Sequence, residues 1–572
     1  MKFDTILEHL GEFGPYQKRM YLMVCIPAIT CAFQSLLPVF TMAFPNFRCA
    51  VPGLANDTYQ SQGQGHGMTV NGSIPWERND DGVATLSQCN VYKNLTAGNQ
   101  TQECTSWVYD KTTFTSTTQS EFNIVCDNKG WRATSNSIAF AGRLTGAFVF
   151  GLSSDLFGRK ITFFLGVLLH SACGIGIAFS HNMMTFNALR FTEGMADSGL
   201  YMVAYVIGME FIGPSKRVIA GMVIDLFWCL GLFILGAVAY FLRDWQHLQL
   251  ALSAPSALML IMWWFIPESP RWLMSRGRDA EAEMIIRKAA EVNGVDLPPS
   301  VFTKSSTEKN QPQGKVWEMF TTPRLLVRCL IVFFNWLVVS MVYYGLGLNV
   351  QNLSGDIYLN FTIANIMETV AYVLCIILLD RTGRKKLHCG SMMLGGIACL
   401  ATIFPVVYGD NSHVWITTAL SMIGKLGASA AFAVIYVFSA ELFPTVVRNS
   451  AMGVNSVFSS VGGVISPYIA DLGILLGGNL KTVLPLIVFG AVSVCAGLLS
   501  LLLPETRRQQ LPENIEDAKT FGKANNNHGP HRNTLGDSYT DGTQDKFKQG
   551  DSETCFNLQG SDVIDVTLKW SK

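Results

Sequence analysis

Charge is scarce in this sequence. Only 15% of its 572 residues are Asp, Glu, Lys or Arg, whereas a typical soluble domain has about 25%. Together with a mean hydropathy above zero, this scarcity excludes an ordinary soluble protein of this size. The net charge of zero is uninformative, because a bilayer protein distributes its charge by leaflet.

Motifs for nucleotide hydrolysis and metal binding are absent as well. There is no G-x-x-x-x-G-K-[ST] phosphate loop, since Gly424 and Lys425 are followed by leucine. There is also no H-E-x-x-H motif and no Cys-x-x-Cys pair. We therefore expect no ATP hydrolysis, no metal site, no cofactor and no enzymatic activity.

A removable signal peptide is missing too. The first nineteen residues carry Asp4, Glu8 and Glu12 and have no apolar core followed by a small-residue cleavage site. We expect the first membrane span itself to direct insertion.

Long apolar runs are what the sequence does have. Hydrophobic residues make up 49% of it, and about twelve uncharged runs approach 20 residues, the length a helix needs to cross about 30 Å of hydrocarbon. They predict an all-α polytopic membrane protein with twelve transmembrane helices. The runs begin near Met20, Ala133, Ile161, Met183, Arg217, His247, Leu326, Asp356, Leu387, His413, Asn449 and Lys481.

Basic residues gather in alternate loops between these runs. By the positive-inside rule those loops are cytoplasmic, which places both termini inside. The basic positions are Lys18/Arg19, Arg159/Lys160, Lys216/Arg217, Arg271 to Arg278, Arg381 to Lys386, Arg448 and Arg507/Arg508.

One long loop, residues 45–132, falls on the other side. Four of the fourteen cysteines lie in it, and an oxidising space would pair them, although four cysteines allow three pairings. Four N-x-S/T sequons in the same loop favour a glycosylated extracellular domain. The cysteines are Cys49, Cys89, Cys104 and Cys126, and the sequons begin at Asn56, Asn71, Asn94 and Asn99.

Three short motifs each occur twice, in the same order and at a nearly constant offset. They follow the second, fourth and sixth spans of two six-helix units, which the cytoplasmic segment from Pro267 to Thr322 joins. Parallel repeats of this kind are a transporter architecture. The pairs are DLFGRK at Asp155 and DRTGRK at Asp380, MEFIGPSKR with Glu210 and Arg217 and AELFPTVVR with Glu441 and Arg448, and PESPRW with Glu268 and Arg271 and PETRRQ with Glu505 and Arg508.

In these motifs the sequence resembles the major facilitator superfamily, whose signature GxxxDxxGRK lies between spans two and three. Within that superfamily, from about Gly11 to Asp517, it looks like the organic cation, carnitine and organic anion transporter family. The resemblance implies a major facilitator fold and pairs Cys49 with Cys104 and Cys89 with Cys126. The motifs that carry it are GEFGPYQ at Gly11, PESPRWL, YYGLGLN at Tyr343, AELFPTVVRN at Ala440 and LPETRRQQLPENIED at Leu503.

The repeat and the loops together predict the division of the chain. The polar tail from Ala518 to Lys572 is rich in Asn, Gly, Asp and Lys, which predicts disorder. The expected parts are a cytoplasmic N-terminal segment (1–19), a first six-helix half (20–266) that includes the loop 45–132, a cytoplasmic linker (267–325), a second six-helix half (326–504) and a cytoplasmic, largely disordered tail (505–572).

The repeated charged motifs are interpreted as a cytoplasmic gate. Asp155 lies at a helix end, where it can accept hydrogen bonds from Arg159 or from a basic residue or helix N-terminus of the other half. Two such latches are expected to hold the cytoplasmic faces shut, and the acid and base pairs to break and reform in each cycle. The alternative is that these charges only enforce topology and loop turns. The gate set is Asp155, Gly158, Arg159, Glu210, Arg217, Glu268, Arg271, Asp380, Arg384, Glu441, Arg448 and Glu505.

Ionisable residues at bilayer depth mark a binding site or a structural pair. Four acids and three bases are predicted there, a mixture that suits an organic cation or a zwitterion better than a simple anion. Arg190 and Glu193 share a helical face and are interpreted as a structural pair rather than as ligands. The seven residues are Arg143, Arg190, Glu193, Asp197, Asp225, Glu368 and Lys425.

Two acids among them are candidate substrate contacts. Glu368 matches a position that the resemblance places at the substrate cavity, although the family usually continues it as E-x-P and this chain has ETV. Asp225 stands beside Phe227 and Trp228, and a carboxylate next to aromatic faces suits an ammonium group. The alternative for Asp225 is a buried acid paired with Arg143 or Lys425.

Tyr343, Tyr344 and Tyr205 are expected to line an aromatic cavity around the substrate, although aromatic residues are common in membrane spans.

One position in span eleven distinguishes carriers within the family that the sequence resembles. Just before a glycine that precedes "SP", the cation carriers have an acid, whereas the anion and carnitine carriers have a base. This chain has the uncharged Ser460 at that position, so the position does not indicate whether the substrate is a cation or an anion. Asp471 lies a few residues further towards the outer face, where a loop-facing role is the commoner one.

We therefore expect a plasma-membrane transporter that moves small organic cations or zwitterions by alternating access. A substrate gradient, the membrane potential or a coupled ion would drive it. Its expected partners are that substrate and the lipid bilayer, and no nucleic acid. One rival is an organic anion carrier that uses Arg143 and Lys425, and another is a non-transporting receptor or scaffold, which the intact repeats disfavour.

Overall fold

The structure is a computed structural model. It describes residues 3–54, 56–78, 84–93, 100–297, 322–408, 414–444, 447–476, 483–507, 509, 512 and 515–521. Contacts divide the chain into Met1–Gly522 and Lys523–Lys572. The second unit, much of the expected linker and most of the expected tail lie outside the described residues.

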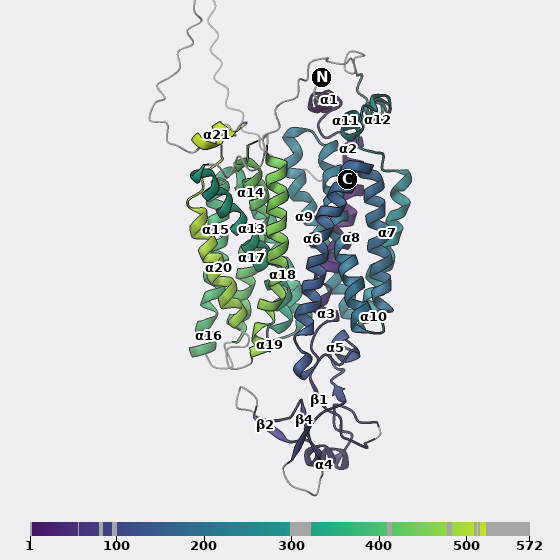
Figure 1. Cartoon of the computed structure of the whole chain (residues 1–572), viewed down its shortest axis with the longest axis vertical. Coiled ribbons are helices and arrows are strands. Elements are labelled where there is room, and N and C mark those ends of the chain that lie inside the picture. The colour runs from purple at the N-terminus through teal and green to yellow at the C-terminus, as the bar shows by residue number, and fades with distance from the viewer. Residues whose placement is uncertain are drawn as a thin grey trace, which may run out of the picture. The chain divides into compact units, whose positions relative to one another are not determined.

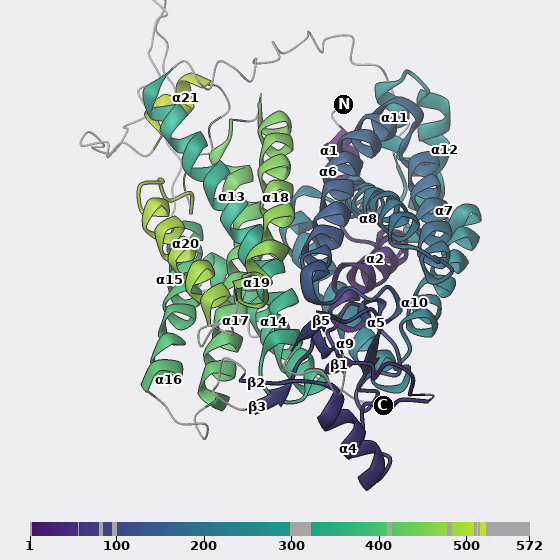
Figure 2. The ribbon, with the colours of Figure 1, turned by 60° about the horizontal axis from the view of Figure 1, so that its bottom comes forward.

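Long helices build the first unit, in two groups that Figure 2 shows side by side. The first group has α1 (Phe3–Leu10), α2 (Pro15–Leu36), α3 (Pro38–Thr41), α6 (Trp131–Phe157), α7 (Arg159–Ala178), α8 (Met183–Phe211), α9 (Arg217–Phe241), α10 (Trp245–Ser253) and the 3-10 helix η3 (Ala254–Trp264). The second has α13 (Pro323–Asn349), α14 (Ile357–Thr382), α15 (Arg384–Ala401), α16 (Ile403–Tyr408), α17 (Val414–Leu442), α18 (Arg448–Ala470), α19 (Leu472–Leu476) and α20 (Leu484–Ser500).

Several helix starts follow directly from local sequence. Asn182, Asp244 and Asp356 precede α8, α10 and α14, and each side chain accepts a hydrogen bond from a backbone N–H of the first turn. These caps satisfy donors that a helix N-terminus leaves unpaired. They fix where the membrane helices begin.

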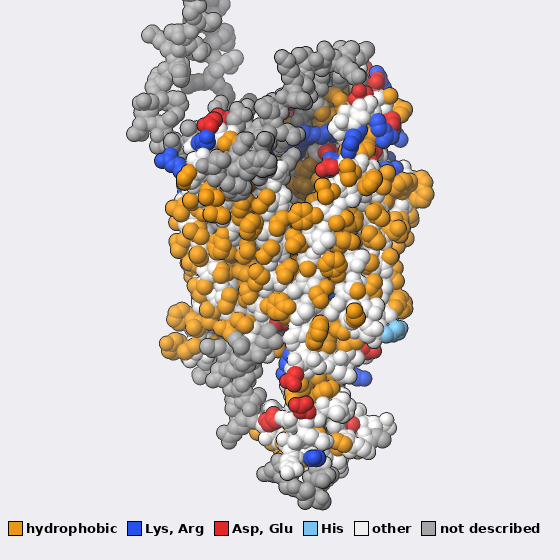
Figure 3. All heavy atoms as spheres, viewed as in Figure 1, with side chains coloured by type: hydrophobic (Ala, Val, Ile, Leu, Met, Phe, Trp, Pro, Cys, Tyr) orange, Lys and Arg blue, Asp and Glu red, His pale blue; other side chains and the backbone are white. Residues whose placement is uncertain are grey.

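Among the described residues, eight helices are long and apolar enough to cross a membrane: α2 with α3, α7, α9, α13, α14, α15 with α16, α17, and α18 with α19. The four remaining positions are filled by α6, α8, α20 and the pair of α10 and η3. Both α6 and α8 carry predicted intramembrane charges, which lower their hydropathy. Apolar side chains cover the visible face of the helical region, and charged ones gather at its two ends (Figure 3). The predicted all-α, twelve-helix class is confirmed.

The two ends of the helices carry different structures (Figure 1). At one, here called the loop end, lies a small domain within the expected loop 45–132. At the other, the linker end, lie α11 (Pro270–Ser275), α12 (Asp279–Asn293) and α21 (Ile515–Thr520).

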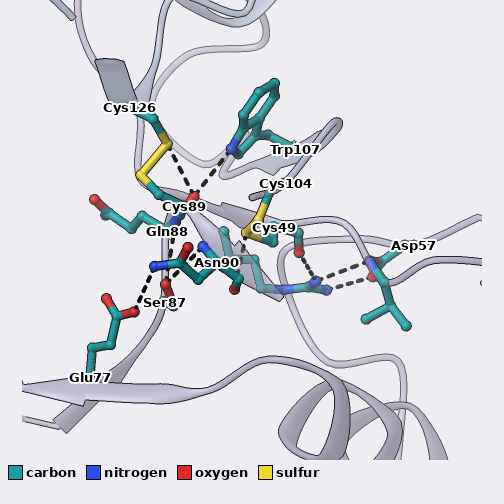
Figure 4. The surroundings of a disulfide bond; sticks show 12 residues. Cys49, Asp57, Glu77, Ser87, Gln88, Cys89, Asn90, Cys104, Trp107 and Cys126 are labelled. Atoms are coloured by element: carbon teal, nitrogen blue, oxygen red, sulfur yellow. Dashed lines mark hydrogen bonds and ion pairs between the residues drawn. A yellow bond between two sulfur atoms is a disulfide. The ribbon is translucent and has the colours of Figure 1, made fainter. Parts of the chain in front are cut away.

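Short antiparallel strand pairs and two disulfides hold the loop domain together. Cys49 bonds Cys104 and Cys89 bonds Cys126, with Cα–Cα distances of 5.7 and 5.8 Å (Figure 4). This is the pairing that the family resemblance implies. The pairs are β1 (Phe47–Cys49) with β6 (Trp107–Tyr109), β2 (Trp76–Arg78) with β3 (Ala84–Leu86), and β4 (Asn90–Tyr92) with β5 (Thr101–Glu103); α4 (Gln64–Ser73) and α5 (Thr118–Glu121) complete the domain.

A buried ion pair supports the same domain. Arg48 donates to both carboxylate oxygens of Asp57, at 2.5 and 3.0 Å. Burial of Asp57 raises the pKa of its carboxyl, but the hydrogen bonds from Arg48 and from the Val51 amide outweigh it and lower the pKa to about 2. Asn56 and Asn71 are exposed, whereas Asn94 and Asn99 lie outside the described residues, so glycosylation stays a prediction.

Candidate functional site

The first GRK motif forms a charged turn between α6 and α7. Arg159 pairs with Asp155 at 2.9 Å and with Glu210 at 3.4 Å. Glu268 accepts hydrogen bonds from the backbone amides of Arg159, at 2.9 Å, and Lys160, at 3.2 Å, at the start of α7. A carboxylate at a helix N-terminus satisfies its unpaired donors and complements its dipole.

The second copy repeats this geometry between α14 and α15. Arg384 pairs with Asp380 at 3.0 Å and with Glu441 at 3.1 Å, and Glu505 accepts from the Arg384 amide at 2.9 Å. Gly158 and Gly383 have φ of 104° and 98°, and a Cβ at either would clash with the carboxylate of Glu268 or Glu505. The motif therefore requires glycine for both backbone and space.

The contacts of these motifs that the structure describes lie within one half, and the gate stays a prediction. Asp155 accepts from Arg159 of its own half, so each motif locks one half to itself. The acids Glu210 and Glu441 pair with the arginines of the GRK motifs, and the pairs that the sequence predicts with Arg217 and Arg448 stay predictions. Those two arginines donate to backbone carbonyls at the ends of α8 and α17, and Arg271 lies exposed on α11.

The described bonds between the halves lie at the loop end and midway along the helices. At the loop end Arg132 of α6, 1% exposed, forms a two-pronged ion pair with Asp471, which follows α18. The ring of Phe40 stacks on Tyr358 at 5.5 Å and meets Phe361 edge-on at 4.9 Å. Asp471 is thus buried in a contact between the halves and does not face a loop.

A cavity of about 330 Å³ adjoins this contact. Residues of both halves and of the loop domain line it, among them Arg132, Asn352, Asp110 and Asp356. Its lining is largely polar, and it lies beside the Arg132–Asp471 pair at the loop end.

Midway along the helices, two of the predicted intramembrane charges form one buried pair. Lys425 Nζ of α17 lies 2.9 Å from Glu368 Oε2 of α14, and the two side chains are 3% and 0% exposed. The same ammonium lies 3.7 Å from the centroid of the Tyr343 ring. A cation held between a carboxylate and an aromatic face is an arrangement that also binds cationic ligands.

Tyr343 of α13 connects this pair to the first half. Its hydroxyl donates to Glu368 Oε1 at 2.6 Å and accepts from Trp228 Nε1 of α9 at 3.0 Å. Tyr372, one turn after Glu368 on α14, donates to the same carboxylate oxygen at 3.2 Å. The bond from Trp228 joins the two halves at the predicted site.

Asp225 has neither of the partners that the sequence suggested. Its carboxylate accepts from Tyr201 at 3.4 Å, while Lys425 pairs with Glu368. Tyr201 packs edge-on against Trp228, with ring centroids 5.8 Å apart. The expected setting of an acid among aromatic rings is therefore present.

Arg143 of α6 also points to the aromatic group. It pairs with Asp197 of α8 at 2.8 Å and donates to Ser35 of α2. Its guanidinium lies 5.6 Å from the ring centroid of Tyr344, which packs against Tyr343 at 5.1 Å. Arg143, Tyr343, Tyr344, Glu368 and Lys425 thus form one chain of contacts.

Three further residues that the sequence singled out make the following contacts. Tyr205 is 36% exposed and lies beside Gly221 of α9. Ser460 donates to the Ser456 carbonyl of its own helix α18. Arg190 donates to Asn136 and to the Met42 sulfur rather than pairing with Glu193, which lies 3.3 Å from His170.

Sequence reasoning missed several polar and aromatic groups in the membrane helices. His170, Tyr201 and Tyr372 lie in apolar runs, where no spacing distinguishes them from packing residues. Trp228 was noted only as a neighbour of Asp225. The lone histidine in the third apolar run was the one available signal, because an ionisable group at that depth is costly.

Comparison with known proteins agrees with this picture. Residues 83–518 match the family described as sugar (and other) transporter. An organic cation transporter protein of Drosophila melanogaster is 40% identical over 537 residues, which cover 91% of this chain and 95% of the relative. The organic cation/carnitine transporter 2 of Homo sapiens is 34% identical over 540 residues, covering 90% and 93%.

Among solved structures, the partially occluded inward-open conformation of the xylose transporter XylE from E. coli matches with a TM-score of 0.59. It covers 87% of this chain and all of that one at 15% identity, which shows the fold alone. The chain is a transporter and not an enzyme, and it belongs to the organic cation, carnitine and organic anion transporter family of the major facilitator superfamily.

Proposed function

We propose that this protein carries small organic cations, or zwitterions with an ammonium group, across the plasma membrane by alternating access. The loop domain lies outside and both termini lie inside. Two observations support this orientation: the disulfides of the loop domain belong in an oxidising space, and the arginines of the repeated motifs gather at the linker end.

The position of the Lys425 ammonium carries the substrate assignment. It lies 2.9 Å from the Glu368 carboxylate and 3.7 Å from the Tyr343 ring centroid. A substrate ammonium would find the same two attractions there. The lysine therefore holds the place of the substrate, and binding exchanges one cation for the other, so the buried carboxylate never loses its counter-charge.

Arg143 and Asp225 extend the site into the first half. Arg143 faces Tyr344, and Asp225 is linked through Tyr201 to Trp228. A zwitterion would place its ammonium at Glu368 and its carboxylate towards Arg143. The hydrogen bond from Trp228 to Tyr343 joins the two halves beside these residues, which supports the proposal because alternating access needs a site between the halves.

Alternation between the two ends would depend on different contacts. The Arg132–Asp471 pair closes the loop end and must break for that end to open. The GRK motifs fix the turns between α6 and α7 and between α14 and α15. These motifs hold the helices of each half together, so that each half can move as a rigid body.

Organic anion transport is the weaker alternative. Both bases that would serve it are already paired, Arg143 with Asp197 and Lys425 with Glu368. An anionic substrate would have to displace Asp197 or Glu368 from these bases, and both carboxylates would repel it.

Uptake of a labelled panel tests the proposal. Cells expressing the protein are given tetraethylammonium, L-carnitine or succinate, with and without membrane depolarisation. We expect uptake of the first or second and not of the third. A fall in tetraethylammonium uptake on depolarisation would indicate net movement of charge, whereas uptake that is insensitive to the potential would indicate exchange for another cation. Succinate uptake alone, at confirmed surface abundance, would contradict the proposal. Glu281→Gln, which changes an exposed acid on α12, is the matched control for Glu368→Gln and should take up the panel like the wild type.

A further inference from the structure

A second group of buried charges lies in the first half, away from Glu368. His170 on α7 and Glu193 and Asp197 on α8 are 1%, 5% and 3% exposed. One atom of each, His170 Nδ1, Glu193 Oε1 and Asp197 Oδ1, lies within 4.8 Å of the other two. None of the three atoms has a hydrogen-bond partner.

The distances within this group are short enough for a shared proton. His170 Nδ1 lies 3.3 Å from Glu193 Oε1 and 3.9 Å from Asp197 Oδ1. A carboxylate oxygen and an imidazole nitrogen that face each other repel when both are bare acceptors, and attract when a proton lies between them.

The surrounding charges leave room for one positive charge. Arg143 of α6 pairs with the second oxygen of Asp197, and Arg190 lies three residues before Glu193 on α8. Two arginines and two acids make a neutral group while His170 is neutral. The other titratable groups nearby are thiols: Cys31 of α2, which donates to the Asp197 carbonyl, and Cys173 on α7.

We propose that His170, Glu193 and Asp197 form a proton-binding site that couples proton movement to substrate movement. This inference rests on the proposed function. A single proton adds one charge to a neutral buried group, whereas a divalent ion would add two and carry a larger desolvation cost.

Arg143 links this site to the substrate site. It pairs with Asp197 on one side and faces Tyr344 on the other, and Tyr344 packs on Tyr343, which binds Glu368. A proton on the group weakens the hold of Asp197 on Arg143. The freed guanidinium then raises the positive potential at the aromatic site and disfavours a cationic substrate.

Proton and organic cation therefore bind alternately, and the protein exchanges them. One proton binds the His170 group from the side to which the cation is released. The same proton leaves to the opposite side before the next cation binds. Only a proton is transferred, so no electron donor or acceptor is needed.

Proteoliposomes containing the purified full-length protein test this exchange with labelled tetraethylammonium and an internal pH dye. Counterflow at equal pH measures the transporter itself, and accumulation driven by an acidic interior measures the coupling. His170→Gln and Glu193→Gln should keep counterflow and lose acid-driven accumulation by about tenfold or more. His247→Gln, an exposed histidine at the start of α10, should change neither.

Each outcome separates the two proposals. Counterflow in the wild type without a proton flux, or with accumulation that follows a sodium or divalent-ion gradient instead, overturns the proton site and leaves the proposed function standing. Absence of counterflow counts against the proposed function. The proton site is then decided by acid-induced infrared difference spectra of the purified protein: a protonation band that Glu193→Gln removes supports it, and an unchanged spectrum overturns it.

Discussion

Lys425 and Glu368 meet in an ion pair 2.9 Å long, at a depth where neither side chain is more than 3% exposed. The pair joins α17 to α14, and Tyr343 of α13 contacts both members. Breaking a buried pair leaves one charge uncompensated, at a cost of about 3–5 kcal/mol. Ionisable residues at this depth are costly and by default mark a functional site, which is why the predictions below begin with this pair.

Glu368→Gln should lower both the stability of the protein and its affinity for tetraethylammonium. The variant removes the carboxylate and strands the Lys425 ammonium. The double variant Glu368→Gln/Lys425→Met removes both charges and should restore surface abundance, while the half-saturating concentration stays about tenfold or more above wild type. If the double variant recovered wild-type affinity, Glu368 would be a structural residue only.

Tyr343→Phe should weaken cation binding without unfolding the protein. The ring stays, but the hydroxyl that accepts from Trp228 and donates to Glu368 is lost. A hydrogen bond to a charged group contributes about 1.5–3 kcal/mol, so we expect the half-saturating concentration to rise about tenfold. Tyr240→Phe, at a half-exposed tyrosine of α9, is the control. Equal uptake curves for the two variants would remove the Tyr343 hydroxyl from the site.

Asp471→Asn should favour opening of the loop end. It leaves Arg132, 1% exposed, without its carboxylate, so the contact between the halves weakens by about 3 kcal/mol or more. The readout is alkylation of a cysteine at Ser137, whose hydroxyl donates across the halves to the Val464 carbonyl. Labelling should rise in Asp471→Asn and return towards the starting level in the exchanged pair Arg132→Asp/Asp471→Arg. If labelling changed neither in Asp471→Asn nor in the exchanged pair, the Arg132–Asp471 contact would not hold the loop end closed.

Gly158→Ala should destabilise the protein by about 2–3 kcal/mol. The backbone has φ of 104°, and the new Cβ would clash with Glu268. Gly277→Ala separates the two causes, because its φ is 73° with open space around it, and strain alone costs about 1 kcal/mol. Gly383→Ala should match Gly158→Ala in thermal unfolding. If all three shifted the unfolding temperature equally, the contact with the acid would contribute nothing.

The loop domain should lose stability in acid through Asp57. Its folded pKa of about 2 lies below its usual value of 3.8. The stabilisation is therefore complete above about pH 4 and is lost as the pH falls towards 2, with a size of about 1 kcal/mol. Asp57→Asn removes this dependence. Thermal unfolding measured from pH 5 to pH 2 would contradict the account if wild type and variant fell in parallel.

The membrane spans, the two halves and the charged turns were predictable because each depends on residues that are close together in the sequence. Runs of apolar residues fix the helices, and DLFGRK and DRTGRK fold to the same turn. The partners of the intramembrane charges were not predictable. Whether Asp225 faces Lys425 or Tyr201, and whether Glu193 faces Arg190 or His170, depends on how α7, α8 and α9 are rotated against one another, which no single helix encodes.

The contacts of the repeated acids show the same limit. Spacing along the chain pointed to Arg217 as a partner of Glu210, and it gave no sign that Arg159, the first residue of α7, reaches Glu210. The contact between Arg132 and Asp471 joins residues 339 positions apart. Only the packing of α6 against α18 brings them together.

The most direct test of the account is binding of labelled tetraethylammonium to purified wild-type protein and to the Glu368→Gln/Lys425→Met variant, which keeps the charge balance of the site. The account predicts saturable binding to the wild type and a loss of about tenfold or more in affinity in the variant. Equal affinity in both proteins would contradict the claim that the buried carboxylate recognises the cation.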